Sequence, residues 1–80
     1  MENTLNLKGE NENQGAMIDV NTIHKFSTYT IADKIRCSIE QQQGITTFLI
    51  NAEELGDLAS VISLGYMSNT SSKIFNVTFV

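Results

Sequence analysis

Residues 34–40 alternate between polar and apolar without interruption, and the apolar positions are Ile35, Cys37 and Ile39. A period of two is typical of a strand with one buried face. Residues 45–50 follow as a β-branched and aromatic run, and a Gln-rich stretch that ends in glycine separates the two segments. The pattern therefore predicts an antiparallel hairpin closed by a short loop.

A helix competes with the first strand of this hairpin over residues 31–43. Thr30 to Asp33 resembles a capping box, and isoleucine recurs at every fourth position after it. The strand is favoured because the alternation places every charge on one face. Residues 23–31 are rich in Thr, Tyr, Phe and Ile, so we expect them to form a preceding strand that turns at Ala32 and Asp33.

The strongest helix pattern lies in residues 51–65. We expect Asn51 to cap this helix and Gly65 to end it. Gly56 lies inside, at a cost of about 1 kcal/mol relative to alanine, so we expect the helix to approach a strand closely there. An apolar stripe with helical spacing consists of Leu55, Leu58, Ala59 and Ile62.

The chain ends in a further strand pattern over residues 73–80, with Phe75, Val77 and Phe79 on the more apolar face. A short segment over residues 17–20 is expected to add at most a small strand in front. The elements follow one another in the order β-β-β-α-β. This order predicts an α+β domain with one antiparallel sheet of about four strands and one helix packed on one face.

The opening of the chain has a different composition. Residues 1–16 are rich in Asn and Glu and hold only Leu5 and Leu7 as sizeable apolar residues after the initiator. Such a segment has little apolar surface to offset the entropy of ordering. We therefore expect a flexible, acidic tail over residues 1–16 and a single small domain over residues 17–80.

Groups able to carry out chemistry are few, since the chain has one histidine, one cysteine, no tryptophan and no proline. His24 has no evident nucleophile or carboxylate partner, and we expect a partly exposed strand residue. Cys37 shares the apolar face of its strand and is expected to pack in the core. Two such residues are too few for a zinc site, and no Gly-rich phosphate loop occurs. The sequence predicts no catalytic residues, no metal site and no cofactor.

Nine acidic and five basic residues give a net charge of −4, which disfavours binding to nucleic acid. A lone cysteine forms no internal disulfide and favours a reducing compartment, so a cytoplasmic location is expected. No apolar run approaches the roughly 18 residues needed to span a bilayer, so we expect no membrane insertion.

A chain with so few reactive groups is expected to act by binding a larger protein, as a non-enzymatic inhibitor or regulator that occupies a functional surface. The terminal strand, residues 73–80, offers unpaired backbone for self-association into a homodimer. The acids at the start of the helix could imitate phosphates, although the helix dipole already explains two of them. The expected partner-binding residues are Tyr29, Glu53, Glu54, Asp57, Tyr66, Met67 and Ile74.

Small size, acidity, few reactive side chains and the expected tail are similar to those of small inhibitors and accessory proteins of phages and mobile elements, including some anti-CRISPR proteins. This similarity lies in composition and not in a motif. The alternative is a module that binds a small ligand or nucleic acid through the sheet. Such a site requires Lys25, Lys34 and Arg36 to gather with Tyr29 on one exposed surface.

Overall fold

The structure, a computed structural model, describes residues 4–64 and 73–80. Short 3₁₀ turns precede the third strand and the helix, at Val20–Thr22 and Ala52–Glu54. The strands and the helix are β1 (Thr4–Lys8), β2 (Gly15–Asp19), β3 (Lys25–Ile31), β4 (Lys34–Gln41), β5 (Gly44–Asn51), α1 (Leu55–Leu64), β6 (Ile74–Asn76) and β7 (Thr78–Phe79).

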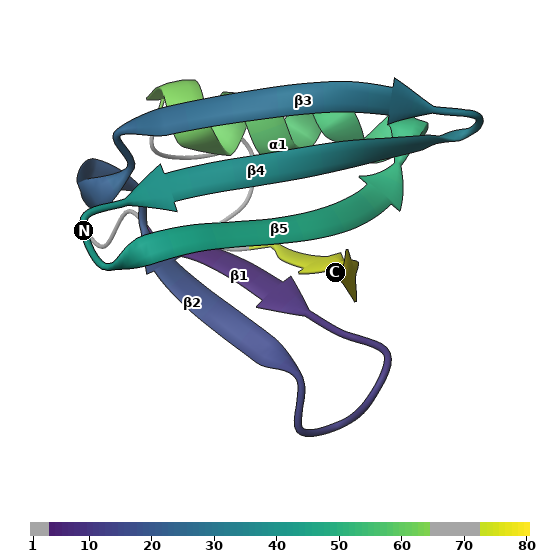
Figure 1. The fold of residues 1–80 in the computed structure, drawn as a ribbon, viewed down its shortest axis with the longest axis horizontal. Helices are drawn as coiled ribbons and strands as arrows, with labels where there is room; N and C mark the ends of the chain where they lie inside the picture. The colour runs from purple at the N-terminus through teal and green to yellow at the C-terminus, as the bar shows by residue number, and fades with distance from the viewer. Residues whose placement is uncertain (1–3, 65–72) are drawn as a thin grey trace.

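The strands form two sheets. The large sheet has the order β3-β4-β5-β7 and is antiparallel throughout, and the small sheet has the order β2-β1-β6. In Figure 1 the large sheet lies in front, with α1 behind β3 and β4 and the small sheet behind and below β5. The predicted α+β class is confirmed, and β3, β4, β5, α1 and β7 reproduce the expected β-β-β-α-β order.

Residues 34–41 form strand β4, so the strand prediction for the middle of the chain is confirmed over the helix. Its burial alternates as the sequence pattern requires, with Ile35, Cys37 and Ile39 buried. The turn between β3 and β4 places Ala32 at a φ of 55°. The turn between β4 and β5 uses Gly44 at a φ of 153°, a conformation that favours glycine.

Residues 4–16 differ from the expected flexible tail. Strands β1 and β2 pair antiparallel from Thr4 opposite Asp19 to Lys8 opposite Gly15. Leu5 and Leu7 lie in the core with 0% and 3% of their surface exposed. The tail prediction counted only local apolar residues, whereas these two leucines gain their burial from β6 and from the large sheet.

The end of the chain passes from one sheet to the other. The predicted strand over residues 73–80 is divided at Val77 into β6, parallel to β1, and β7, antiparallel to β5. The Val77 N–H donates to the Lys8 carbonyl at 2.8 Å, and the Val80 N–H donates to the Thr47 carbonyl at 3.1 Å. The predicted inward face is confirmed, because Phe75 and Val77 are buried.

Helix α1 starts later than the sequence predicts, because a 3₁₀ turn precedes it. Asn51 occupies the capping position but makes no capping hydrogen bond with its side chain. Its Oδ1 instead accepts a 2.6 Å hydrogen bond from Lys34 Nζ. The expected close approach at Gly56 is wrong, since a Cβ placed there would meet nothing within 4 Å.

One core lies between the large sheet and the layer formed by α1 and the small sheet. The side chains of Phe26, Leu55, Ile62 and Phe79 are partly buried against it. The buried side chains are Leu5, Leu7, Ile18, Ile35, Cys37, Ile39, Phe48, Ile50, Leu58, Val61, Phe75 and Val77.

Candidate binding surfaces

The large sheet has an outer face that points away from the core. Because Ile35, Cys37 and Ile39 are buried, the alternate residues of β4 point the other way. The strand register extends this face to β3 and β5. In Figure 1 it faces the viewer, opposite α1. We call it the open face, and its residues are Lys25, Ser27, Tyr29, Ile31, Lys34, Arg36, Ser38, Glu40, Ile45, Thr47 and Leu49.

Large apolar side chains on the open face are exposed. Tyr29 is 68% exposed, Ile45 65% and Ile31 45%. Tyr29 was expected to contact a partner, whereas Ile31 and Ile45 were not identified from the sequence. The signal for Ile45 was present, because the β5 sequence is apolar on both faces and a sheet with one solvated face should alternate.

The three cations of the alternative prediction lie on this face, with Lys25 and Lys34 at its opposite ends. Lys25 lies opposite Glu40, and Tyr29 lies opposite Arg36. Lys34, at the other end of β4, is also exposed. On these three strands the open face thus carries three cations and one acid, although the whole chain has a net charge of −4. The local charge of this surface is therefore opposite in sign to the net charge of the protein.

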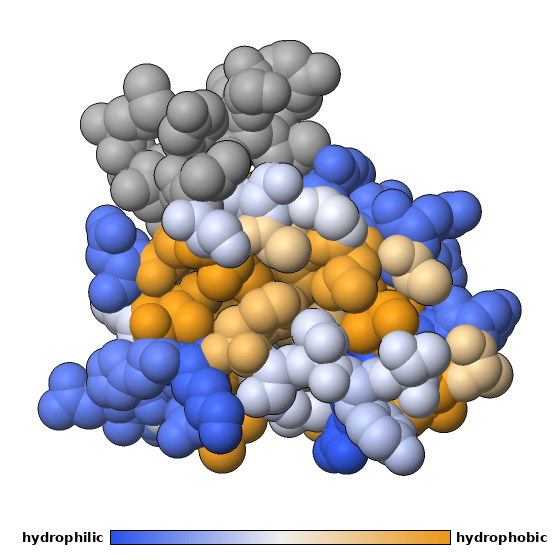
Figure 2. Space-filling view, turned by 90° about the horizontal axis from the view of Figure 1, so that it is seen from above, coloured by the Kyte–Doolittle hydropathy of each residue, from blue (hydrophilic) through white to orange (hydrophobic). Residues whose placement is uncertain are grey.

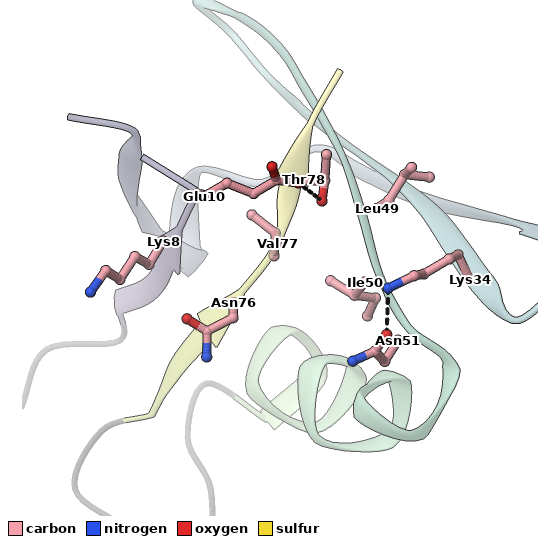
Figure 3. A pocket seen from close by; sticks show the side chains of 10 residues that line it. Lys8, Glu10, Lys34, Leu49, Ile50, Asn51, Asn76, Val77 and Thr78 are labelled. Atoms are coloured by element: carbon pink, nitrogen blue, oxygen red, sulfur yellow. Dashed lines mark hydrogen bonds between the residues drawn. The ribbon is translucent and has the colours of Figure 1, made fainter. Parts of the chain in front are cut away.

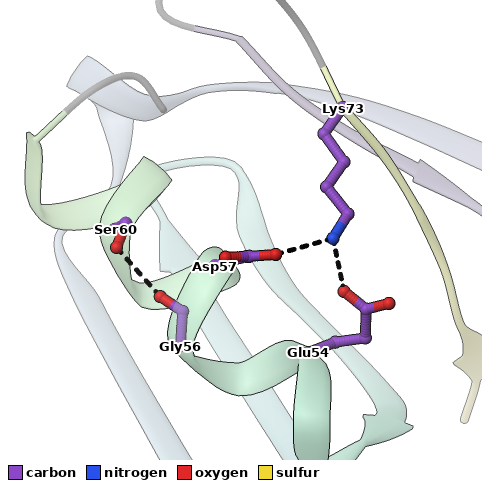
Figure 4. A network of polar contacts seen from close by, with 5 residues as sticks. All are labelled: Glu54, Gly56, Asp57, Ser60 and Lys73. Atoms are coloured by element: carbon purple, nitrogen blue, oxygen red, sulfur yellow. Dashed lines mark hydrogen bonds and ion pairs between the residues drawn. The ribbon is translucent and has the colours of Figure 1, made fainter. Parts of the chain in front are cut away.

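The acids at the start of α1 are partly neutralised. Lys73 Nζ donates to Glu54 Oε2 at 2.6 Å and to Asp57 Oδ2 at 2.8 Å (Figure 4). The hydrogen bonds to Asp57 and then to Glu54 raise the pKa of the Lys73 ammonium above its ordinary value. Lys73 also lies 5.1 Å from the centre of the Phe75 ring. Glu53 stays exposed, so the predicted acidic patch presents less negative charge than three free carboxylates.

Ile74 lies on the small sheet, away from the open face. The register places Asn6 between Met17 on β2 and Ile74 on β6. Met17 is 77% exposed and Ile74 58%. These two side chains border a shallow hollow of about 450 Å³. Met17 was not identified from the sequence, because its neighbour in space belongs to a strand at the other end of the chain.

The predicted partner-binding residues therefore do not form one surface. Tyr29 lies on the large sheet, Ile74 on the small sheet, and the acids at the start of α1. Tyr66 and Met67 lie outside the residues that the structure describes. Among the predicted residues that the structure describes, Glu54 and Asp57 are brought together by their shared contact with Lys73.

A second hollow, of about 410 Å³, lies where the two sheets meet (Figure 3). Four of its polar side chains are already hydrogen-bonded in two pairs. Lys34 donates to Asn51, and Thr78 Oγ1 donates to Glu10 Oε1 at 2.8 Å. The hollow is lined by Lys8, Gly9, Glu10, Lys34, Leu49, Ile50, Asn51, Asn76, Val77 and Thr78.

His24 and Cys37, the two residues with the most reactive side chains, differ in exposure. His24 is exposed, and its backbone N–H donates to the Glu40 carbonyl at 2.7 Å. Cys37 is fully buried, as predicted. Burial raises the pKa of the Cys37 thiol to about 11, which keeps it protonated and poorly nucleophilic near neutral pH.

Over residues 4–64 and 73–80, no three His, Cys, Asp or Glu side chains lie close enough together to hold a metal ion. In the same part of the chain, no helix has the length and apolar character needed to cross a bilayer. Comparison with known proteins gives no match to a family model, a curated protein or a solved structure. The fold and its surfaces therefore carry the functional argument alone.

Proposed function

We propose that this chain is a non-enzymatic protein-binding domain and that the open face of the large sheet is its binding surface. The observation that carries this proposal is the combination of exposed Tyr29, Ile31 and Ile45 with the cations Lys25, Lys34 and Arg36 on one side of one sheet. Exposed apolar groups on one face of a rigid scaffold are typical of interaction surfaces.

The pair formed by Tyr29 and Arg36 supports a protein partner. These residues lie directly opposite each other at the middle of the face. Tyr and Arg are the side chains most enriched among the residues that dominate binding energy at protein interfaces. Three hydrogen-bonded strands also hold the surface in place before binding, which lowers the entropy cost of association.

The charge of the open face defines the kind of partner. Lys25, Lys34 and Arg36 are interspersed with the exposed apolar side chains of this face. The complementary surface is therefore a protein patch that combines apolar residues with Asp and Glu. Binding there would act by steric occlusion. This is the mode expected of a small inhibitor or regulator, such as those encoded by phages, that covers a functional surface of a larger protein in the cytoplasm.

Site-specific photocrosslinking tests this proposal. A photoreactive phenylalanine analogue in place of Tyr29 is expected to form an adduct with one protein in extracts of the source cells. The same analogue in place of Ser63, which is exposed on α1, is expected to form none. Arg36→Ala should reduce the Tyr29 adduct at least tenfold, or about 1.4 kcal/mol in binding. Lys8→Ala removes one cation from the small sheet and should leave the adduct unchanged. Equal adducts from positions 29 and 63 would contradict the proposal.

Arg36 lies opposite Tyr29, and Lys25 and Lys34 lie on the same face. This arrangement also favours a second candidate function, the binding of single-stranded nucleic acid. Cations along a sheet with an aromatic residue for stacking are the elements of such a site. Fluorescence anisotropy with short RNA and DNA at low salt separates the two functions. Binding that weakens as salt rises and is lost in Arg36→Ala supports nucleic acid. Absence of binding removes this candidate and leaves the protein-binding proposal intact.

A further inference from the structure

Strand β3 forms an unprotected edge of the large sheet. It pairs with β4 on one side, and no strand among the described residues pairs with its other side. At seven residues it is longer than the other edge strands, β2, β6 and β7. Its register with β4 runs unbroken from Lys25 to Ile31. Between these two ends the strand has no charge and no proline, which are common devices that keep sheet edges from pairing.

An apolar area runs beside this edge. Figure 2 looks onto the molecule from the side of β3 and α1 and shows apolar side chains gathered between them. Phe26 on β3 and Leu55 and Ile62 on α1 are only partly buried. Thr28 and Thr30 point to the same side as Phe26 and are exposed. A strand added at the β3 edge would therefore also cover apolar surface of the domain.

We propose that β3 pairs antiparallel with β3 of a second copy of this chain and that the two large sheets join into one sheet of eight strands. A twofold axis at Thr28 pairs the strand over its whole length, with Lys25 opposite Ile31 of the second copy. The interface is the same patch on both copies, so it closes as a dimer.

Charge complementarity favours a second copy as the occupant. Lys25 begins the strand, and Asp33 lies in the turn directly after it. Antiparallel pairing brings Lys25 of each copy close to the turn that holds Asp33 of the other. Two exposed ion pairs between these residues would contribute orientation more than affinity. The same pairing places the partly exposed apolar residues of the two α1 helices on one side of the joined sheet.

This interface differs from the self-association predicted through residues 73–80. That segment is divided into β6, with three residues, and β7, with two. Each offers a shorter run of unpaired backbone than β3. The proposal does not depend on the proposed function, because a dimer through the β3 edge leaves the open face of each copy uncovered.

Sedimentation equilibrium with the full chain tests the dimer. The wild-type protein is expected to dimerise reversibly with concentration. Thr28→Lys places like charges opposite each other at the twofold axis, so its dissociation constant should rise at least tenfold. Gln43→Lys adds the same charge in the β4–β5 turn and should leave the constant unchanged. A wild-type protein that stays monomeric at about 1 mM would overturn the proposal, because any dissociation constant would lie above that value. So would a Thr28→Lys variant that dimerises as tightly as the wild type.

Hydrogen exchange of the backbone amides locates the interface without a mutation. Edge amides of β3 that point away from β4 should exchange more slowly at high protein concentration than at low concentration. Amides of β6 and β7 should show no such dependence. A concentration-dependent slowing confined to β6 and β7 would assign the dimer to residues 73–80 and would contradict the β3 interface.

Discussion

Leu7 on β1 and Phe75 on β6 are partners in a parallel ladder, and both side chains are buried. The pair joins the two ends of the chain and makes β1 the central strand of the small sheet. The first strand therefore contributes directly to the core, although its own segment of sequence is mostly polar.

Leu7→Ala is expected to destabilise the protein by about 2–5 kcal/mol, because it removes buried methyl groups and leaves a cavity beside Phe75. Asn13→Ala, at an exposed position between β1 and β2, is expected to change the stability by less than about 0.5 kcal/mol. Urea unfolding followed by circular dichroism measures both. Removal of residues 1–16 should abolish cooperative unfolding. A truncated chain that unfolds with the wild-type midpoint would show that β1 and β2 are dispensable.

Strand β1 was missed, whereas β2 overlaps the small strand predicted over residues 17–20. The difference shows which part of this fold can be predicted from the sequence. The period-two pattern in residues 34–40 and the helix pattern after Asn51 are local, and both elements form. Leu5 and Leu7 stand alone among polar residues, so their burial depends on a parallel partner at the far end of the chain. No local pattern encodes that pairing.

The same contrast between local patterns and distant pairing applies to the candidate surfaces. The alternation along β4 placed Lys34 and Arg36 on one face, and the predicted pairing of β3 with β4 was enough to place Lys25 and Tyr29 on the same face. The acids of α1 were correctly located but incompletely described, because the ion pairs of Glu54 and Asp57 require Lys73 from a distant segment. Contacts between side chains of distant segments cannot be predicted from the pattern of a single strand or helix.

Cys37 is expected to resist thiol reagents in the folded protein. Its thiol is buried and its pKa is raised to about 11, so little thiolate exists at pH 8. The rate of labelling with a chromogenic disulfide should be limited by the unfolding motion that exposes Cys37, and labelling should become fast in denaturant. Rapid labelling of the native protein at pH 8 would mean that β4 is exposed in solution.

The same thiol links stability to pH. A pKa raised by folding means that the unfolded chain loses the proton first, so stability is fully present below the ordinary value of 9.0 and is lost as pH rises to about 11. The difference in free energy of unfolding between wild type and Cys37→Ala should therefore shrink between pH 9 and pH 11. Urea titrations across this range measure it. A difference that stays constant would show that the thiol titrates equally in both states.

Lys73→Met is expected to lower the melting temperature, because Glu54 and Asp57 lose the cation that bridges them and offsets the repulsion between their negative charges. The raised pKa of Lys73 means that this contribution is fully present below the ordinary lysine value, about pH 10, and is lost above it. Salt should reduce the contribution, since the pair is partly exposed. Scanning calorimetry at several pH values and salt concentrations measures the change. Lys25→Met, which removes a cation from β3, is the control and should show a smaller effect at pH 7.

Gly9 and Gly56 form a matched pair for alanine substitution with opposite expected signs. A Cβ on Gly9 would lie 2.5 Å from Gln14 Cβ and 3.1 Å from Phe79 Cδ2. Gly9→Ala should therefore destabilise the protein by about 1–3 kcal/mol through overpacking. A Cβ on Gly56 meets nothing within 4 Å and improves the helix propensity of α1, so Gly56→Ala should stabilise by up to about 1 kcal/mol. Chemical denaturation of the two variants compares them directly. A gain in stability from Gly9→Ala would show that the β1–β2 hairpin moves freely away from Phe79, contrary to the packing found here.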